Sequence, residues 1–464
     1  MEFNKIQFPD TWNKYSLDDV CSKITSGGTP SRTKPEFYEN GSINWVKTKE
    51  LNNYYIYDTE EKITEEALKK SSAKLLPTNT ILLAMYGATV GELGILSKEM
   101  ACNQACCALI TNPKICDYRY LFYLLAFHKE EIINLATGAA QQNISAKIIR
   151  ELTFRFPDID QQKEIVDVLN TLDKKIQLNT QINQTLEQIA QTIFKSWFID
   201  FDPVHAKANA LANGQTAEQA TQAAMAVISG KNTQELHRLQ TANPEQYQQL
   251  WEIAEAFPSG FDEEGVPRGW EMTVVKSVCE KIQNGGTPKR SNKEYWNNGN
   301  IPWLSSGEVC NNNILVSSKE FITQLGLENS STKLIEANST LVALYASPTA
   351  GKCSFCAFKA TTNQAVCALV PKEIYKYFNF YYLQTKEEYY SNQAVGSAQQ
   401  NISKGIVENT PIFKPDNMIL SYFNLIVGGL MNKQISNLKE NDHLKSIRDE
   451  LLPKLLSGEI LNGN

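Results

Sequence analysis

The chain carries the same sequence pattern twice, at positions 258 residues apart. The segment Ile24–Pro30 returns as Ile282–Pro288, and Gly138–Ser145 returns as Gly396–Ser403. Solenoids and propellers are built from repeats of roughly 20–50 residues. A period of 258 residues excludes those folds and matches a whole domain plus a connector. The sequence therefore predicts two homologous globular domains on one chain, with pseudo-two-fold symmetry and a target that itself has two halves.

Each copy mixes strand and helix patterns. Short apolar runs bounded by Gly, Pro and Asn predict strands at 81–86, 105–110, 340–345 and 366–370. Aromatic-rich runs with helical spacing predict helices at 117–127 and 374–383. We therefore expect a mixed α+β fold for both domains, over residues 1–157 and 267–415.

Apolar residues recur at heptad spacing after each copy. Polar Asn179 and Asn183 fall on the seam of the first helix, where such residues typically fix register. The second helix opens less regularly, around residues 414–418, so we expect it either to start late or to pack less regularly. The seam residues are Ile165, Leu169, Leu172, Ile176, Leu186, Ile189 and Trp197, and then Leu444, Ile447, Leu451 and Leu455. An antiparallel coiled coil of residues 158–202 and 416–464 would separate the domains, and two independent surface helices are the alternative.

The net charge of −6 is unevenly distributed. Residues 1–155 carry no net charge, residues 156–267 carry −9 and residues 268–415 carry +4. The acidic excess therefore lies in the first helix and in a helical connector predicted at 203–266. If the neutral-to-basic repeated domains bind nucleic acid, a partner must supply part of the positive charge.

The order and duplication of these motifs resemble a known family, the specificity subunits of type I restriction–modification systems. The resemblance rests on the doubled Gly-Gly-Thr-Pro and Gln-Gln-Asn-Ile-Ser motifs, on residues 194–203 and on residues 451–458. It implies two target-recognition domains, each reading one half of a split, asymmetric double-stranded DNA site. It also implies that the helical spacer sets the gap between half-sites and docks two methyltransferase subunits, which two restriction subunits can join. S-adenosylmethionine would then be bound by the methyltransferase subunits, and no cofactor by this chain.

The two repeated motifs supply the candidate DNA contacts. Arg and Lys suit phosphate or guanine, and Gln and Asn can pair with adenine in the major groove. The predicted contacts are Gly28, Thr29, Arg32, Lys34, Tyr86, Gln141, Gln142 and Asn143 in the first copy, and Gly286, Thr287, Lys289, Arg290, Tyr345, Gln399, Gln400 and Asn401 in the second.

Each candidate has a structural alternative. The glycine turns either cradle a phosphate with backbone N–H groups or need positive φ for a tight turn. The basic residues could be solvated, the tyrosines could pack in the core, and Asn143 or Ser145 could cap the next helix. Trp12, Trp45, Trp270 and Trp303 are predicted core residues.

A catalytic interpretation finds little support. Neither an Asn-Pro-Pro-Tyr motif nor a glycine-rich cofactor loop occurs, and a nuclease pattern fits only by forcing it onto Asp158, Asp173 and Lys175. Cys353 and Cys356 lack the further ligands of a zinc site, so no metal is expected. Without a signal peptide or a long apolar run, we expect a cytoplasmic protein with no membrane contact. We therefore expect a non-catalytic DNA-recognition subunit; the alternatives are a self-contained DNA methyltransferase or endonuclease, and a pure protein-interaction scaffold.

Overall fold

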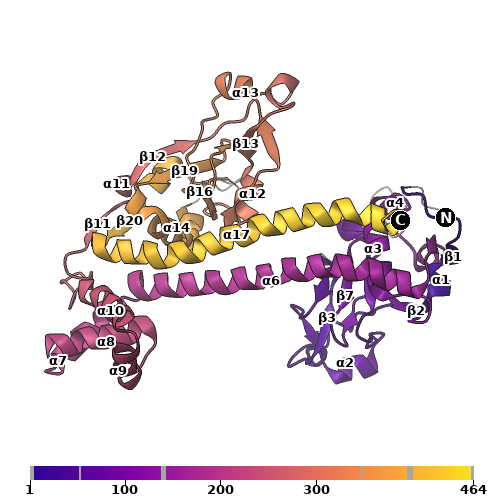
Figure 1. Ribbon diagram of the computed structural model, residues 1–464, viewed down its shortest axis with the longest axis horizontal. Helices are drawn as coiled ribbons and strands as arrows, with labels where there is room; N and C mark the ends of the chain where they lie inside the picture. Colours follow the sequence, from indigo (N-terminus) through magenta and orange to yellow (C-terminus); the bar gives the residue numbers. More distant parts are fainter. Residues whose placement is uncertain (1–4, 52–53, 137–142, 346–348, 394–400, 461–464) are drawn as a thin grey trace. The chain divides into compact units, whose positions relative to one another are not determined.

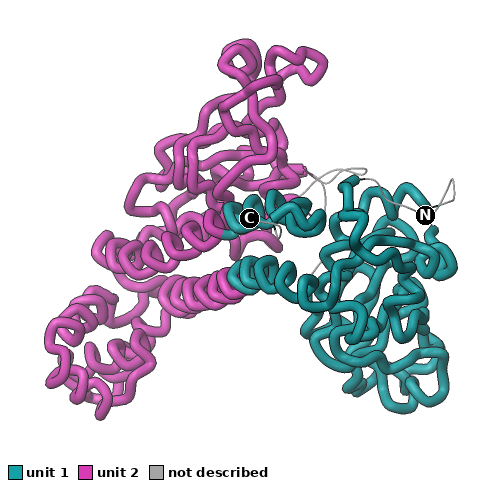
Figure 2. The backbone as a smooth tube through the Cα atoms, turned by 45° about the vertical axis from the view of Figure 1, so that its right-hand side comes forward, with its two compact units in different colours: residues 1–177, 441–464 teal, residues 178–440 magenta. Residues whose placement is uncertain are grey.

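Two compact units make up the computed structural model, which describes residues 5–51, 54–136, 143–345, 349–393 and 401–460. Unit 1 comprises residues 1–177 with 441–464, and unit 2 comprises residues 178–440 (Figure 2). The boundary between the two units falls inside both predicted spacer ranges, because each long helix has one part in unit 1 and the other part in unit 2.

Unit 1 contains the first copy of the repeat, folded around a five-stranded sheet of order β2-β9-β6-β7-β4 (Figure 1). A three-stranded sheet β5-β3-β8 and the pair β1-β10 complete it. Its strands are β1 Asn13–Ser16, β2 Cys21–Ser26, β3 Ile43–Val46, β4 Tyr55–Ile56, β5 Lys62–Ile63, β6 Ile81–Ala84, β7 Leu93–Leu96, β8 Ala101–Cys102, β9 Cys106–Thr111 and β10 Thr153–Phe156. Its helices are α1 Leu17–Val20, α2 Glu65–Lys70, α3 Tyr118–Phe127, α4 Lys129–Asn134, α5 Ala146–Arg150 and the first part of α6 Ile159–Phe198.

Unit 2 repeats this topology strand for strand. Its sheets run β12-β19-β16-β17-β14, β15-β13-β18 and β11-β20. The strands are β11 Glu271–Val274, β12 Cys279–Asn284, β13 Ile301–Leu304, β14 Ile314–Leu315, β15 Glu320–Ile322, β16 Ser339–Ala343, β17 Cys353–Cys356, β18 Thr361–Thr362, β19 Val366–Pro371 and β20 Pro411–Lys414. The helices are α7 Asp202–Ala212, α8 Ala217–Ser229, α9 Thr233–Ala242, α10 Pro244–Ala256, α11 Val275–Val278, α12 Ser306–Asn311, α13 Gln324–Glu328, α14 Lys376–Gln384, α15 Glu387–Gln393, α16 Lys404–Glu408 and the first part of α17 Asn417–Leu456. The mixed α+β expectation is confirmed.

The central strands are apolar throughout because both faces of each sheet are covered. Along β6, Ile81 and Leu83 enter the core that also holds α3, whereas Leu82 and Ala84 enter a second core on the opposite face. The four predicted strands and the two predicted aromatic helices are all present. The predicted core tryptophans are buried, with Trp45 and Trp303 each 2% exposed.

The second spacer helix does not start late, so that part of the expectation is wrong. Both α6 and α17 are 40 residues long. Asp158 caps the start of α6 by accepting a hydrogen bond from the backbone N–H of Gln161 (2.8 Å), and Asp416 accepts one from that of Met418 (2.7 Å). An aspartate cap suffices to start a helix without a heptad pattern behind it.

Within unit 2, α6 and α17 pair through a polar layer. The Asn437 side-chain amide donates to Asn183 Oδ1 (2.8 Å), and Asn183 Nδ2 donates to the backbone carbonyl of Gln434 (3.1 Å). Asn179 Nδ2 donates to Glu440 Oε2 (2.8 Å) and is 1% exposed. Residue numbers rise along α6 as they fall along α17, so this pair is antiparallel. The predicted helix pairing with buried asparagines is confirmed here, against the alternative of independent surface helices.

The predicted seam is wrong at one position. Ile189 is 43% exposed, whereas Ala190 and Phe194 are buried. Ile189 lies off the alternating steps of three and four, which run from Asn179 and Asn183 through Leu186 to the buried Ala190. Phe194 contacts Phe378 of α14 and Phe423 of α17 instead. Of the other seam positions, Ile165, Leu169, Trp197 and Leu455 are buried, and Leu172, Ile176, Leu186, Leu444, Ile447 and Leu451 are half-buried.

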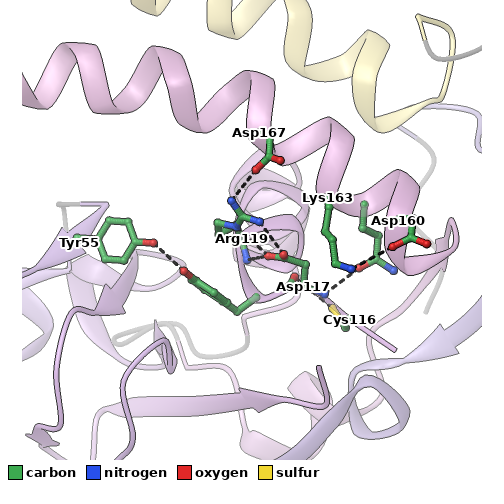
Figure 3. A network of polar contacts seen from close by, with 9 residues as sticks. Tyr55, Cys116, Asp117, Arg119, Asp160, Lys163 and Asp167 are labelled. Carbon is green, nitrogen blue, oxygen red and sulfur yellow. Dashed lines mark hydrogen bonds and ion pairs between the residues drawn. The ribbon is translucent and has the colours of Figure 1, made fainter. Parts of the chain in front are cut away.

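A polar network attaches α6 to the recognition domain of unit 1 (Figure 3). Arg119 of α3 donates to Asp117 Oδ2 (2.9 Å) and to Asp167 Oδ1 on α6 (2.8 Å). Gln162 of α6 is buried; its Oε1 accepts from the Asp117 backbone N–H (2.9 Å) and its amide donates to the carbonyl of Ile115 (2.9 Å). These contacts hold the domain at a defined place on the helix.

The acidic connector folds into the helices α7–α10, which pack on one another in unit 2 (Figure 1). Lys207 of α7 is 5% exposed, and its ammonium donates to the carbonyls of Ala254, Glu255 and Phe257 at 3.2, 3.1 and 2.6 Å. These carbonyls lie at the C-terminus of α10, where backbone acceptors lack helical partners and attract a cation. One buried lysine therefore closes the end of the bundle.

Candidate nucleic-acid interface

The Gly-Gly-Thr-Pro turn in each unit follows the first strand of the large sheet. The backbone N–H groups of Gly27 and Gly28 donate to the carbonyls of Cys106 (3.2 Å) and Cys102 (2.9 Å). Those of Gly285 and Gly286 donate in the same way to Val366 (3.2 Å) and Thr362 (2.8 Å). The turn is therefore fastened to the two neighbouring strands by its own amides.

The prediction that Gly28 and Gly286 cradle a phosphate with backbone N–H groups is wrong, because these groups are already bonded. The alternative of positive φ is wrong as well, since neither residue is among those with positive φ. Glycine is needed for close approach: an added Cβ would lie under 3.0 Å from Ser72 at Gly28, and from Ser331 and Thr332 at Gly286. The indole N–H of Trp45 donates to the Gly28 carbonyl (3.0 Å), and that of Trp303 to the Gly286 carbonyl (3.0 Å).

Next to the glycines, each turn contacts a glutamine. Thr29 Oγ1 donates to Gln104 Oε1, and Thr287 Oγ1 donates to Gln364 Oε1 (2.7 Å). Both glutamines are exposed and precede the strands β9 and β19. Sequence reasoning missed both, although the aligned Asn-Gln-Ala segments of the two copies carried the signal.

The described residues of the second motif, Asn143 to Ser145 in unit 1 and Asn401 to Ser403 in unit 2, lie at the same end of the sheet as the glycine turn. Met85 links the two regions: its N–H donates to the carbonyl of Ala105 (2.8 Å), and its carbonyl accepts from Ile144 N–H (2.9 Å). Unit 2 repeats the connection, with Leu344 N–H donating to Ala365 (2.8 Å) and Ile402 N–H donating to Leu344 (2.9 Å). The fold thus brings the glycine turn and the described part of the second motif to one sheet end in each copy, which we call the recognition edge.

Tyr86 and Tyr345 lie on this recognition edge and are 42% and 40% exposed, so the alternative of core packing is wrong for both. Tyr86 forms an antiparallel bridge with Asn143, which is exposed. Asn401 is half-buried. The remaining candidates Gln141, Gln142, Gln399 and Gln400 lie outside the described residues.

The capping alternative is confirmed for the serine of this motif. Ser145 Oγ accepts from the backbone N–H of Ile148 at the start of α5 (3.2 Å), and Ser403 Oγ accepts from that of Ile406 at the start of α16 (3.3 Å). Asn143 therefore does not serve as the cap of α5, and its side chain is available for another role.

Arg32 and Arg290 are held beside the turns rather than freely solvated. Arg32 forms an ion pair with Glu61 (2.6 Å) and lies over the rings of Tyr38 and Trp45. Arg290 likewise pairs with Glu320 (2.5 Å) and lies over the rings of Trp296 and Trp303. The hydrogen bond from Arg32 lowers the pKa of Glu61, and that from Arg290 lowers the pKa of Glu320. Lys34 and Lys289 are exposed.

The residues of the nuclease and zinc alternatives have other partners. Asp158 caps α6, and Asp173 pairs with Arg448 (2.9 Å) and accepts a hydrogen bond from Tyr123. Cys353 and Cys356 lie three positions apart on β17 and enter separate cores, so they cannot chelate one ion. Across the described residues, no group of three or more His, Cys, Asp or Glu is gathered for a metal ion. None of the described helices has the length and apolar character needed to cross a bilayer.

Comparison with known proteins agrees with a duplicated recognition fold. The family described as "Type I restriction modification DNA specificity domain" matches residues 9–188 and 267–419, one match for each copy. The chain therefore belongs to this family and is a type I restriction–modification specificity protein with a role in DNA recognition.

Relatives match along nearly the whole chain. The HindI specificity subunit of Haemophilus influenzae is 32% identical over 97% of this chain and 99% of its own length. The MjaIX specificity subunit of Methanocaldococcus jannaschii is 27% identical over 98% and 94%. A solved S subunit from M. genitalium shares the fold at a TM-score of 0.55 and 15% identity, over 98% of this chain and 97% of that one.

Proposed function

We propose that this chain reads a bipartite, asymmetric site on double-stranded DNA, with one recognition edge for each half-site. The observation that carries this proposal is the duplication of the recognition edge: the same turn, glutamine, tyrosine and asparagine stand at one sheet end in each unit. The side chains near the two turns differ, with Ser31 to Lys34 in one copy and Lys289 to Asn292 in the other. Two similar scaffolds with different contact residues suit two different half-sites.

The chain further acts as a non-catalytic scaffold in the cytoplasm. Two methyltransferase subunits dock on the spacer helices and bind S-adenosylmethionine, and two restriction subunits join them. Asp158 and Asp173 support the absence of nuclease chemistry, since both carboxylates are engaged in structural contacts. No cofactor is needed by this chain itself.

Methylation mapping of the host genome, with and without this gene, tests the proposal. We expect the methylated sites lost with the gene to share two unlike half-sites at a constant gap. The purified chain alone should transfer no methyl group from labelled S-adenosylmethionine to DNA. A single continuous motif, or methyl transfer by the chain without a partner, would overturn the proposal.

A further inference from the structure

Each unit places a threonine–glutamine pair and a lysine around its glycine turn. We propose that Thr29, Gln104 and Lys74, with their unit 2 counterparts, bind phosphate groups of the DNA backbone and position each domain without reading sequence. The counterparts are Thr287, Gln364 and Lys333. This inference rests on the proposed function and adds residues to the recognition edge that the motifs had not identified.

The hydrogen bond within the pair fixes which group the glutamine offers. Gln104 Oε1 accepts from the Thr29 hydroxyl, and Gln364 Oε1 accepts from Thr287 (2.7 Å). Each amide therefore presents its N–H donors on an exposed side chain. Phosphate oxygens are pure acceptors and the commonest partners of such donors in protein–DNA complexes.

The lysine supplies charge at the same turn. Lys74 Nζ donates to Thr25 Oγ1 (2.7 Å) and to the carbonyl of Ser26 (3.2 Å), which directly precedes the glycines. In unit 2, Lys333 is exposed and follows Thr332, whose backbone closely approaches Gly286. Because the first domain has no net charge, a lysine held at this edge matters for attracting DNA.

Identity between the copies decides between backbone and base contacts. Two unlike half-sites have different base edges, and what they share is the sugar–phosphate backbone. Residues that distinguish the two half-sites must therefore differ between the copies, whereas residues that bind the shared backbone can stay the same. The threonine, glutamine and lysine are identical in both copies, and the threonine–glutamine contact is the same in both folds.

The test uses the full chain assembled with its methyltransferase subunits, and two DNA duplexes. One duplex carries the mapped site and the other carries the same site with both half-sites scrambled. The variants are Lys74→Gln with Lys333→Gln, Gln104→Ala and Gln104→Glu. Gln104→Glu keeps an acceptor for Thr29 but replaces the amide donor by a negative charge. Lys98→Gln is the control, because Lys98 is exposed and follows β7 at the opposite end of the sheet.

We expect each lost lysine to reduce the slope of log affinity against log salt by about 0.9. Gln104→Ala should weaken binding by about three- to tenfold, the range for one lost hydrogen bond, and Gln104→Glu should weaken it more. The loss should be equal on both duplexes, and Lys98→Gln should leave both affinities unchanged.

Loss confined to the duplex with the mapped site would assign these residues to base reading and overturn the inference. Unchanged affinity and slope, with thermal melting showing a folded chain, would also overturn it. If the unmodified complex fails to distinguish the two duplexes, the proposed function itself fails, so the two failures are distinguishable.

Discussion

At the scale of single residues, the turns require glycine because there is no space for a Cβ atom at Gly28 and Gly286. A turn motif with paired glycines suggests positive φ, but the structure requires close approach of neighbouring backbone segments instead. The space at Gly28 is taken by the Ser72 backbone, which belongs to a segment that sequence spacing alone does not connect to the turn.

Gly28→Ala should therefore destabilise unit 1 by about 1–3 kcal/mol, the usual cost of overpacking against atoms that cannot move aside. Gly87→Ala is the matched control: its added Cβ meets nothing within 4 Å, but its φ of +73° costs about 1 kcal/mol in a non-glycine residue. Urea unfolding of the two variants measures the difference. A Gly28→Ala variant as stable as the unsubstituted chain would contradict the close-approach explanation.

At the scale of elements, the paired helices in unit 2 depend on buried polar contacts. Asn183 and Asn437 form one hydrogen bond between α6 and α17, and Asn437 is 1% exposed. Such contacts specify register more than they add stability. The contribution of these contacts to stability is therefore best measured by replacing the two asparagines singly and together.

Asn183→Leu should cost about 1–3 kcal/mol, because it leaves the buried Asn437 amide without its acceptor. Asn183→Leu combined with Asn437→Leu should recover most of that loss, since both polar groups are then removed. A double-mutant cycle by chemical denaturation measures the coupling. Additive losses in the double variant would show that the hydrogen bond does not link the two helices energetically.

Glu187 of α6 makes this helix pair sensitive to pH. Burial raises the pKa of Glu187, although Gln191 Nε2 and the Tyr381 hydroxyl donate to it (2.8 and 3.2 Å). A group whose pKa is higher in the folded state binds more protons there, so stability falls as pH rises through its titration range. Glu187→Gln should therefore raise the melting temperature at pH 7, and the gain should shrink as pH falls towards the ordinary glutamate pKa. A gain that grows at acidic pH would contradict the buried-carboxylate explanation.

At the scale of the whole molecule, the net charge limits how strongly the chain can bind DNA without a partner. The net charge is −6, and the acidic excess lies in residues 156–267, which include all of α6 and the α7–α10 helices. Phosphate binding depends on Lys and Arg side chains. In the first domain their charge is balanced by that of Asp and Glu, so the domain carries no net positive charge.

The isolated chain should therefore bind its DNA site weakly and with a shallow salt dependence. Adding the methyltransferase subunits should raise the affinity and steepen the slope of log affinity against log salt by about 0.9 for each new phosphate contact. Titrations of labelled duplex at several salt concentrations measure both quantities. Equal slopes with and without the partner would show that this chain makes all the phosphate contacts itself.

The sequence by itself determined the duplication, the apolar central strands and the existence of the long helices. These features are written in local patterns: identity at constant spacing, strand-length apolar runs and heptads interrupted by asparagine. The strands and helices could be predicted because each depends on residues that are neighbours in sequence, and the duplication because it appears as identity between two segments of the same sequence.

Only the tertiary structure decided which groups are free to bind a ligand. Gln104 meets Thr29 across 75 positions, Gln364 meets Thr287 across 77, and Asn437 meets Asn183 across 254. Other distant contacts, from Gly28 to Cys102 and from Gly286 to Thr362, occupy the glycine amides that the motif had suggested for phosphate. A local pattern specifies a backbone path, whereas the availability of a donor or a space depends on what the fold brings beside it.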